Sequence, residues 1–392
     1  MPLPLYLLAL AVFAMGTSEF MLAGLLPDIA SDLGVAVGTA GTLTSAYAIG
    51  MIVGAPLMAA LARKRPGRAS LFGFVLVFLA AHALGAATEG FPVLFATRVV
   101  AALANAGFLA VALTTAATLV PADQKGRALA VLLSGTTVAM VAGVPGGSVL
   151  GTLLGWRATF WAVAALCLPA AIGIVTGVPA RRGQKDAAEG PTLRAELAQL
   201  GSPRLLVVVL LAALVNAATF AGITFLAPVV TGTAGLGELW IPVVLVLFGA
   251  GSFVGVTVAG RLSDQRPGSV LAVGGPLLLI GWPALAVLAD RPVALLVLVF
   301  VQGALSFALG STLITRILYE AAEAPTMAGS YATAALNIGA AAGPLVAATT
   351  LTTAAGNLGP LWVSGLLVVV ALLIAFPLRT VVAAGRSSEA LR

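Results

Sequence analysis

Twelve apolar runs, each long enough to cross a lipid bilayer, constrain the fold of this chain more than any other feature. A hydrocarbon core of about 30 Å requires about 20 consecutive apolar residues in an α-helix. The runs are too long and too uniformly apolar for the short alternating strands of a membrane β-barrel. We therefore expect an all-α integral membrane protein with twelve transmembrane helices, near residues 4–26, 39–61, 69–88, 92–119, 127–153, 158–178, 204–230, 239–261, 269–288, 293–317, 326–352 and 358–379.

The composition excludes several other classes of protein. Hydrophobic residues make up 60% of the chain and charged residues only 9%, whereas soluble domains carry about 25% charged residues. The net charge of +6 comes from residues in short connections, which argues against nucleic-acid binding. The single cysteine, Cys167, lies in an apolar run and excludes a disulfide framework. No metalloprotease, serine-hydrolase or P-loop motif occurs, so neither an enzyme, an ATP-driven pump nor a resident cofactor is expected.

The distribution of Lys and Arg predicts the orientation in the membrane. The connections after even-numbered spans, together with the C-terminal tail, hold seventeen of the twenty, Arg316 among them. The opposite side holds only Arg157 and Arg291. Because positive residues accumulate on the cytoplasmic side, both termini are expected in the cytoplasm. The remaining one, Arg98, falls inside the fourth span.

The spans divide into two halves around one polar segment. We expect an N-terminal six-helix bundle over 1–178, a cytoplasmic linker over 179–203, a C-terminal six-helix bundle over 204–380 and a cytoplasmic tail over 381–392. The stretch GMIVG at 50–54 matches GSFVG at 251–255, and RPG at 65–67 matches RPG at 266–268, both at an offset of 201 residues. A shared offset indicates a duplication, and parallel six-span repeats place a substrate site between the halves near the membrane midplane.

Three motifs make the resemblance specific: EFMLAGLLPDIASDLG in the first span, AGVPGGSVLGTLLGWRATFW in spans five and six, and LNIGAAAGP in span eleven. They resemble the twelve-span drug:proton antiporters of the major facilitator superfamily, including the chloramphenicol-resistance exporters of actinomycetes. The resemblance implies a monomer in the cell membrane that exports a small amphipathic antibiotic such as chloramphenicol by alternating access, with protons in exchange. A sugar or metabolite exporter of the same superfamily is the alternative. Five tryptophans that lie mostly near span ends favour a drug.

The cytoplasmic signature of the family departs from its usual form in the first half. There the stretch AALARKRPGR places Arg63 where the family has an acid. The second half keeps Gly260, Asp264 and Arg266 in GRLSDQRPG. The resemblance implies that Asp264 and Arg266 stabilise an inside gate. The alternative is that both stretches are only basic topological anchors.

Glycines recur every four residues in four spans and would form smooth helix faces. They are Gly143, Gly147, Gly151 and Gly155 in span five, Gly50 and Gly54 in span two, Gly251 and Gly255 in span eight, and Gly339 and Gly343 in span eleven. The family architecture implies that span five packs on span eight and span two on span eleven, across the boundary between halves. We expect these faces to let the halves rock, with tight packing as the simpler alternative. Pro145 is expected to kink span five.

Two charged side chains lie clearly inside the predicted spans, Glu19 and Arg98. Each is seven residues from the outer end of its span, or about 10 Å at 1.5 Å per residue. The shared depth permits contact between the two, and we expect Glu19 to carry a coupling proton with Arg98 as its countercharge. The family also places an arginine in the fourth span, here in RVVAA. The alternatives are a static ion pair, or a protonated and hydrogen-bonded Glu19.

Other polar groups have weaker assignments. Asp28 and Asp32 are expected in the external loop and as helix caps. The only histidine, His82 in span three, is expected at the membrane interface, with a proton relay as the less favoured role. Polar and aromatic residues inside the spans are candidates for an apolar substrate cavity with a few amides, or for interhelical contacts. These candidates are Tyr47, Asn105, Phe108, Asn216, Phe220, Gln302, Ser306 and Asn337.

Overall fold

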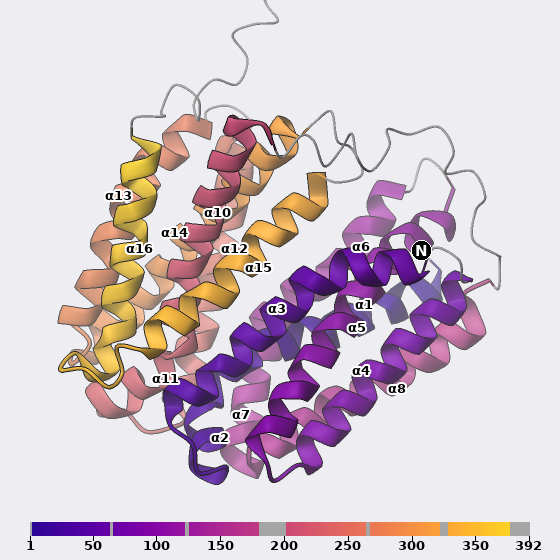
Figure 1. Ribbon diagram of the computed structural model, residues 1–392, viewed down its shortest axis with the longest axis horizontal. Helices are drawn as coiled ribbons and strands as arrows, with labels where there is room; N and C mark the ends of the chain where they lie inside the picture. Colours follow the sequence, from indigo (N-terminus) through magenta and orange to yellow (C-terminus); the bar gives the residue numbers. More distant parts are fainter. Residues whose placement is uncertain are drawn as a thin grey trace, which may run out of the picture. The chain divides into compact units, whose positions relative to one another are not determined.

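The computed structural model describes residues 2–62, 66–121, 125–179, 201–263, 267–321 and 328–376. Twelve helices within these ranges are long and apolar enough to cross a membrane (Figure 1). The expected all-α, twelve-span class is therefore confirmed. Arg63, Asp264 and Arg266 of the two cytoplasmic signatures lie outside the described residues, as do 180–200 of the linker, 377–380 at the end of the last predicted bundle and the tail over 381–392.

Two compact units make up the molecule. The first contains the first six spans together with Thr224–Thr231 and Leu236–Val246. Its helices are α1 (Leu3–Phe20), the 3-10 turn η1 (Met21–Gly24), α2 (Leu26–Asp32), α3 (Val37–Ala62), α4 (Gly67–Ala87), α5 (Phe91–Thr118), α6 (Lys125–Val138), the π-helical turn η3 (Ala139–Gly143), α7 (Val144–Leu154) and α8 (Trp156–Gly177).

The second unit contains most of the last six spans. The elements of these spans are α10 (Pro203–Thr224), α11 (Leu226–Pro228), the π-helical turn η5 (Val229–Thr233), α12 (Trp240–Ser263), α13 (Pro267–Val287), α14 (Pro292–Glu320), α15 (Ala328–Ala348), the 3-10 turn η6 (Gly356–Leu358) and α16 (Gly359–Ala375).

Spans one and seven are interrupted at corresponding places. In span one the α-helix stops at Phe20, and α2 begins at Leu26. In span seven α10 stops at Thr224, and α11 begins at Leu226. Pro27 and Pro228 follow these breaks at the same offset of 201 residues. Proline has no N–H to donate to the residue four positions earlier and its ring clashes with that carbonyl, so each proline favours the break. The matching breaks support the duplication.

Span five also departs from a regular α-helix. The π-helical turn η3 ends at Gly143, two residues before Pro145. The proline cannot donate a hydrogen bond to the preceding turn, and a π-helical turn is one way for the chain to accommodate this loss. The irregularity expected at Pro145 is therefore present as a local change of helix type.

Each glycine face closely approaches a neighbouring helix of its own half. A Cβ on Gly50 would lie 2.6 Å from the Cβ of Ala102 in α5, and Gly54 faces the same helix. Similarly, Gly251 and Gly255 face α14, Gly339 and Gly343 face α10, and Gly143, Gly147 and Gly151 face α8 or the first span. The spacing of glycines every four residues shows that a helix face is smooth. Many neighbouring helices fit a smooth face equally well.

Gly155 does not belong to the span-five face. It has φ +84°, and no atom lies within 4 Å of the position of a Cβ there. This backbone conformation favours glycine, and Gly155 ends α7 before α8 begins at Trp156.

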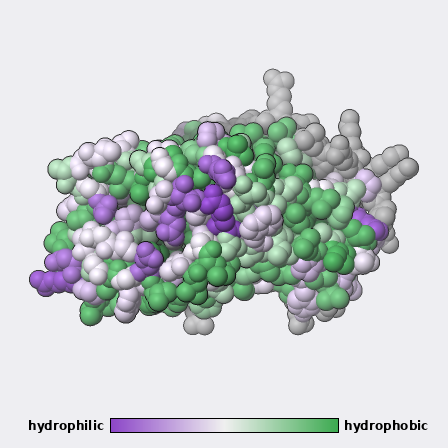
Figure 2. Space-filling model, turned by 90° about the horizontal axis from the view of Figure 1, so that it is seen from below, coloured by the Kyte–Doolittle hydropathy of each residue, from purple (hydrophilic) through white to green (hydrophobic). Residues whose placement is uncertain are grey.

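The surface of the molecule suits a lipid environment. Large aliphatic side chains such as Leu154, Ile172 and Leu373 are exposed on the spans. Hydrophobic residues cover much of the face seen in Figure 2. In a soluble protein such contiguous apolar surface would be unusual, whereas lipid tails solvate it in a membrane.

Candidate functional site

Arg98 is the centre of a buried polar cluster in the first unit. Its side chain is 1% exposed within α5. One terminal nitrogen donates to the Ser18 hydroxyl at 2.7 Å, and the other donates to the Ser18 carbonyl at 2.7 Å. Ser18 lies in the last turn of α1, where carbonyls lose their partners within the helix. The break after Phe20 therefore provides an acceptor for the guanidinium.

His82 on α4 completes the hydrogen bonding of Ser18. Its Nδ1 lies 2.8 Å from the Phe78 carbonyl, and its Nε2 lies 2.7 Å from the Ser18 hydroxyl. A carbonyl only accepts, so Nδ1 carries the proton, and in the neutral ring Nε2 then accepts from Ser18. The hydroxyl thus donates to His82 and accepts from Arg98. The His82 side chain is 1% exposed and lies inside the bundle.

Tyr47 and Asn105 form the other side of the cluster. The Arg98 guanidinium lies 4.4 Å from the centroid of the Tyr47 ring, a cation–π arrangement. The Asn105 amide donates to the Tyr47 hydroxyl at 2.9 Å and to the Met51 sulfur at 3.5 Å. The sequence places Asn105 seven residues after Arg98, and two helical turns bring both to one face of α5.

Two buried polar atoms of this cluster have unused hydrogen-bonding capacity. Within the part of the chain that the structure describes, Arg98 Nε and Asn105 Oδ1 have no hydrogen-bond partner. A buried donor or acceptor without a partner is costly, so such atoms often mark a place where another molecule binds. The cluster therefore combines one free donor, one free acceptor and an aromatic ring.

Glu19 lies beside the cluster but does not form a direct ion pair with Arg98. Its carboxylate interacts electrostatically with Arg98 and Tyr47, yet Glu19 and Arg98, both within the described residues, form no salt bridge with each other. Successive residues on a helix point about 100° apart. Because Ser18 faces Arg98, the adjacent Glu19 points elsewhere. The predicted shared depth is consistent with this arrangement, and the static ion pair considered as an alternative is absent.

The two aspartates after the first span lie in α2 rather than in a loop. Asp32 pairs with Arg157 at the start of α8 and accepts from Trp156 Nε1 at 3.1 Å. The Arg157 hydrogen bond is the largest influence that lowers the pKa of Asp32 below its ordinary value. Asp28 in the first turn is half-buried, and burial, with a smaller contribution from Glu238, raises its pKa.

In the second unit, the candidate amides Asn216 and Asn337 bond to helix backbone. The Asn216 amide donates to the Leu336 carbonyl of α15 at 2.6 Å, and the Asn337 amide donates to its own helix at Thr333. Gln302 is fully buried and faces α13, where a Cβ on Gly281 would lie 2.5 Å from its amide oxygen. These three amides contribute to helix packing.

The remaining side chains of interest in this unit are also buried. Phe220 on α10 and Ser306 on α14 are 8% and 3% exposed. Arg316, counted above with the cytoplasmic connections, is 4% exposed within the last turns of α14. The predicted end of span ten at residue 317 was therefore three residues too short, since α14 continues to Glu320.

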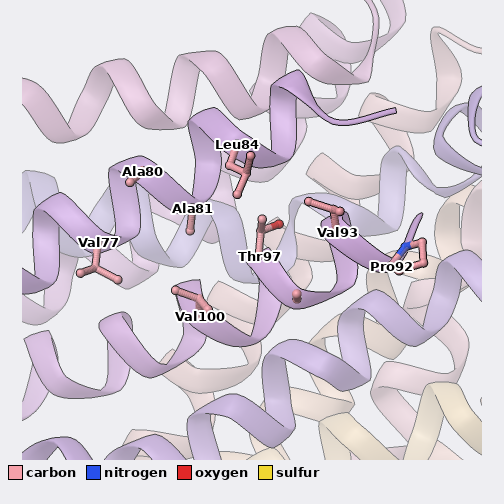
Figure 3. A pocket seen from close by; sticks show the side chains of 9 residues that line it. Val77, Ala80, Ala81, Leu84, Pro92, Val93, Thr97 and Val100 are labelled. Carbon is pink, nitrogen blue, oxygen red and sulfur yellow. The ribbon is translucent and has the colours of Figure 1, made fainter. Parts of the chain in front are cut away.

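A separate apolar groove of about 490 Å³ lies between α4 and α5. Val77, Leu84, Val93 and Val100 line it with carbon atoms (Figure 3). All four are more than 40% exposed on the outside of the bundle. The only polar side chain in its lining, Thr97, bonds to the Leu94 carbonyl of its own helix. The groove offers lipid tails a surface but no polar recognition.

Comparison with known proteins decides the family. A family model described as the Major Facilitator Superfamily matches residues 8–334. The chain belongs to the major facilitator superfamily. It is therefore a multi-pass membrane transporter rather than an enzyme, as the sequence predicts.

Two relatives match most or all of the chain. The chain is 78% identical, over 392 residues and the full length of both chains, to the "Chloramphenicol resistance protein" of Streptomyces lividans. It is 32% identical over 340 residues to the "Inner membrane transport protein YdhP" of Escherichia coli K12, covering 87% of this chain and 86% of that protein.

Two solved transporter structures share the fold. A bacterial homologue of the human lysosomal transporter Spinster matches 97% of this chain and 96% of its own with a TM-score of 0.76 and 17% identity. The nucleoside transporter NupG matches 97% of this chain and 99% of its own with a TM-score of 0.76 and 12% identity. At such identities the likeness concerns the fold alone.

Proposed function

We propose that this superfamily member exports chloramphenicol from the cell in exchange for protons. The observation that carries the proposal is the 78% identity, over the full length of both chains, to a protein named for chloramphenicol resistance. A transporter this similar over its whole length is expected to accept the same class of compound.

The polar cluster of the first unit suits such a substrate. Chloramphenicol carries an aromatic ring, two hydroxyls and an amide, and has no net charge. A site for it requires apolar walls with a few donors and acceptors. Asn105 Oδ1 can accept from a hydroxyl or amide, Arg98 Nε can donate, and the Tyr47 and Phe108 rings add apolar surface. In the second unit, Asn216, Phe220, Gln302, Ser306 and Asn337 remain proposed contributors.

Glu19 is the proposed site of the coupling proton. Among the charged side chains in the described spans, it is the carboxylate nearest the buried Arg98. A carboxylate beside a fixed cation changes its proton affinity whenever the distance between the two changes. Alternating access would supply such changes. The cell's proton gradient then drives export without a bound cofactor.

The glycine faces have a revised role in the proposed cycle. Because they join helices of the same half, they would hold each bundle together as it moves, rather than provide a sliding surface. Asp264 and Arg266 remain the proposed inside gate, and monomeric operation remains part of the proposal.

The proposal is tested by expression in a susceptible strain that lacks its own drug exporters. Accumulation of labelled chloramphenicol is measured with and without an uncoupler. We expect accumulation to fall on expression and to recover when the uncoupler collapses the proton gradient. Unchanged accumulation would refute the substrate and favour a sugar or metabolite exporter. A fall that the uncoupler does not reverse would refute the coupling to protons.

A further inference from the structure

The Ser18–His82 pair is the feature of the buried cluster that the proposed transport cycle leaves without a role. Both side chains are at most 1% exposed, and they belong to different helices, α1 and α4. Burying a titratable ring beside an arginine has a cost. A hydrogen-bond chain that satisfies every polar atom of both residues offsets it.

The donor and the acceptor of each hydrogen bond from the Phe78 carbonyl through His82 and Ser18 to Arg98 are fixed. The Phe78 carbonyl fixes the proton on His82 Nδ1. Nε2 is then an acceptor, so the Ser18 hydroxyl donates to it and keeps its lone pairs for Arg98. A doubly protonated His82 would place a second cation against the Arg98 guanidinium, which like-charge repulsion disfavours.

We propose that His82 is a positioning residue that orients the Ser18 hydroxyl to hold Arg98 away from Glu19. This inference rests on the proposed role of Glu19 as the proton site. A carboxylate in a direct ion pair binds a proton less readily than one whose cation is held elsewhere. The Ser18–His82 pair thus keeps Glu19 able to bind a proton while Arg98 stays buried and hydrogen-bonded.

The ionisable groups around the cluster come from all the helices packed against it. They are Glu19 on α1, Tyr47 on α3, His82 on α4, Arg98 on α5 and Cys167 on α8. Tyr47 and Cys167 are ordinarily neutral at the pH of transport assays. Glu19 and Arg98 are therefore the pair whose separation the proposal concerns.

The first test measures the pH dependence of chloramphenicol transport in vesicles. In His82→Phe the ring keeps its packing beside Phe78, 4.2 Å away, but loses the acceptor for Ser18. In Ser18→Ala the hydroxyl itself is lost. We expect both variants to shift the pH midpoint of transport downward by about one unit, because Arg98 becomes free to pair with Glu19.

Two further variants separate positioning from general damage. His82→Gln offers an acceptor near the position of Nε2 and is expected to restore the wild-type midpoint. Thr97→Val removes a hydroxyl next to Arg98 that bonds only to its own helix, and it should behave like the wild type. A wild-type midpoint in His82→Phe, or a shift in His82→Gln equal to that in His82→Phe, would overturn the proposal.

A second measurement does not depend on proton coupling. Thermal unfolding in detergent is compared for His82→Phe, Arg98→Met and the double variant. If His82 acts on Arg98 through Ser18, the two Tm shifts are not additive, because the interaction is lost only once. Additive shifts would contradict positioning even if protons drive transport. Non-additive shifts with gradient-driven transport intact in Glu19→Gln would support positioning and refute the proton site instead.

Discussion

Ser18 and Glu19 are chain neighbours with different surroundings at the end of α1. Ser18 faces the interior and accepts two hydrogen bonds from Arg98. Glu19 lies one step around the helix and is half-buried. Adjacent residues on a helix point about 100° apart. A list of the charged residues therefore does not tell which side chain faces Arg98.

Asn105→Leu tests substrate recognition at the residue scale. The change removes the buried acceptor Oδ1 and preserves apolar volume. We expect the KM for chloramphenicol to rise about 2- to 10-fold, the value of one neutral hydrogen bond, with a smaller effect on the maximal rate. Transport in vesicles provides the measurement. Ser252→Ala is the control, since Ser252 bonds only to its own helix at Phe248. An unchanged KM in Asn105→Leu would exclude this amide from the site.

Asp28→Asn and Asp32→Asn are predicted to change stability in opposite directions. The pKa of Asp28 is raised by burial, so its contribution to stability is present below its ordinary pKa of 3.8 and is lost as the pH rises through the higher folded value. Asp28→Asn should therefore raise Tm at pH 7 and have little effect near pH 4. Thermal unfolding in detergent at the two pH values measures this difference.

Asp32 is the matched comparison on the same helix. Its pKa is lowered by the Arg157 hydrogen bond, so its stabilising contribution is present above pH 3.8 and is lost as the pH falls through the lower folded value. Asp32→Asn should lower Tm at pH 7, by a small amount because the pair is exposed. A lower Tm for Asp28→Asn at pH 7 would contradict the assignment.

Among single residues, the sequence identified the intramembrane charges but not their partners. Glu19 and Arg98 are evident because a charge inside a membrane span is rare. Ser18 is a small polar residue of a kind that occurs throughout membrane helices, and nothing local marks it. His82 is the only histidine in the sequence, and this alone could have marked it as a candidate partner of the buried charges. Its proximity to Arg98 depends on the packing of α4 against α5, which no single-chain pattern reports.

At the scale of elements, prolines and glycines decide where helices break and where they approach closely. The sequence predicted the irregularity at Pro145, but it missed the repeated breaks before Pro27 and Pro228. The 201-residue offset that relates these two prolines was a usable signal. The partners of the glycine faces were not predictable, because a face lined by small residues fits many neighbours.

Gly147→Leu tests the close packing of span five. A Cβ on Gly147 would lie 3.1 Å from Thr159 of α8, whereas no atom lies within 4 Å of the same position on Gly146. We expect Gly147→Leu to abolish transport while the protein still inserts into the membrane. Gly146→Leu should be close to the wild type. Membrane content is measured by immunoblot beside drug efflux, and normal efflux by Gly147→Leu would show that the close approach is dispensable.

At the scale of the whole molecule, apolar runs and an internal repeat were enough to predict the fold. The length of the spans follows from the thickness of the bilayer, and the orientation follows from the accumulation of positive residues on the cytoplasmic side. The internal repeat indicates the two halves. The substrate does not follow from such rules. A cavity with a few amides and rings suits many amphipathic compounds, and the proposal of chloramphenicol depends on similarity over the full length of a named relative.

Efflux driven by an imposed pH gradient in vesicles that contain Glu19→Gln tests proton coupling most directly. The wild type and Glu89→Gln, a change at an exposed outer residue, should transport labelled chloramphenicol in response to the gradient. In Glu19→Gln that response should be lost, while chloramphenicol still equilibrates down its own gradient, because the amide cannot carry a proton. A full response to the pH gradient in Glu19→Gln would contradict the central claim that this carboxylate couples protons to drug export.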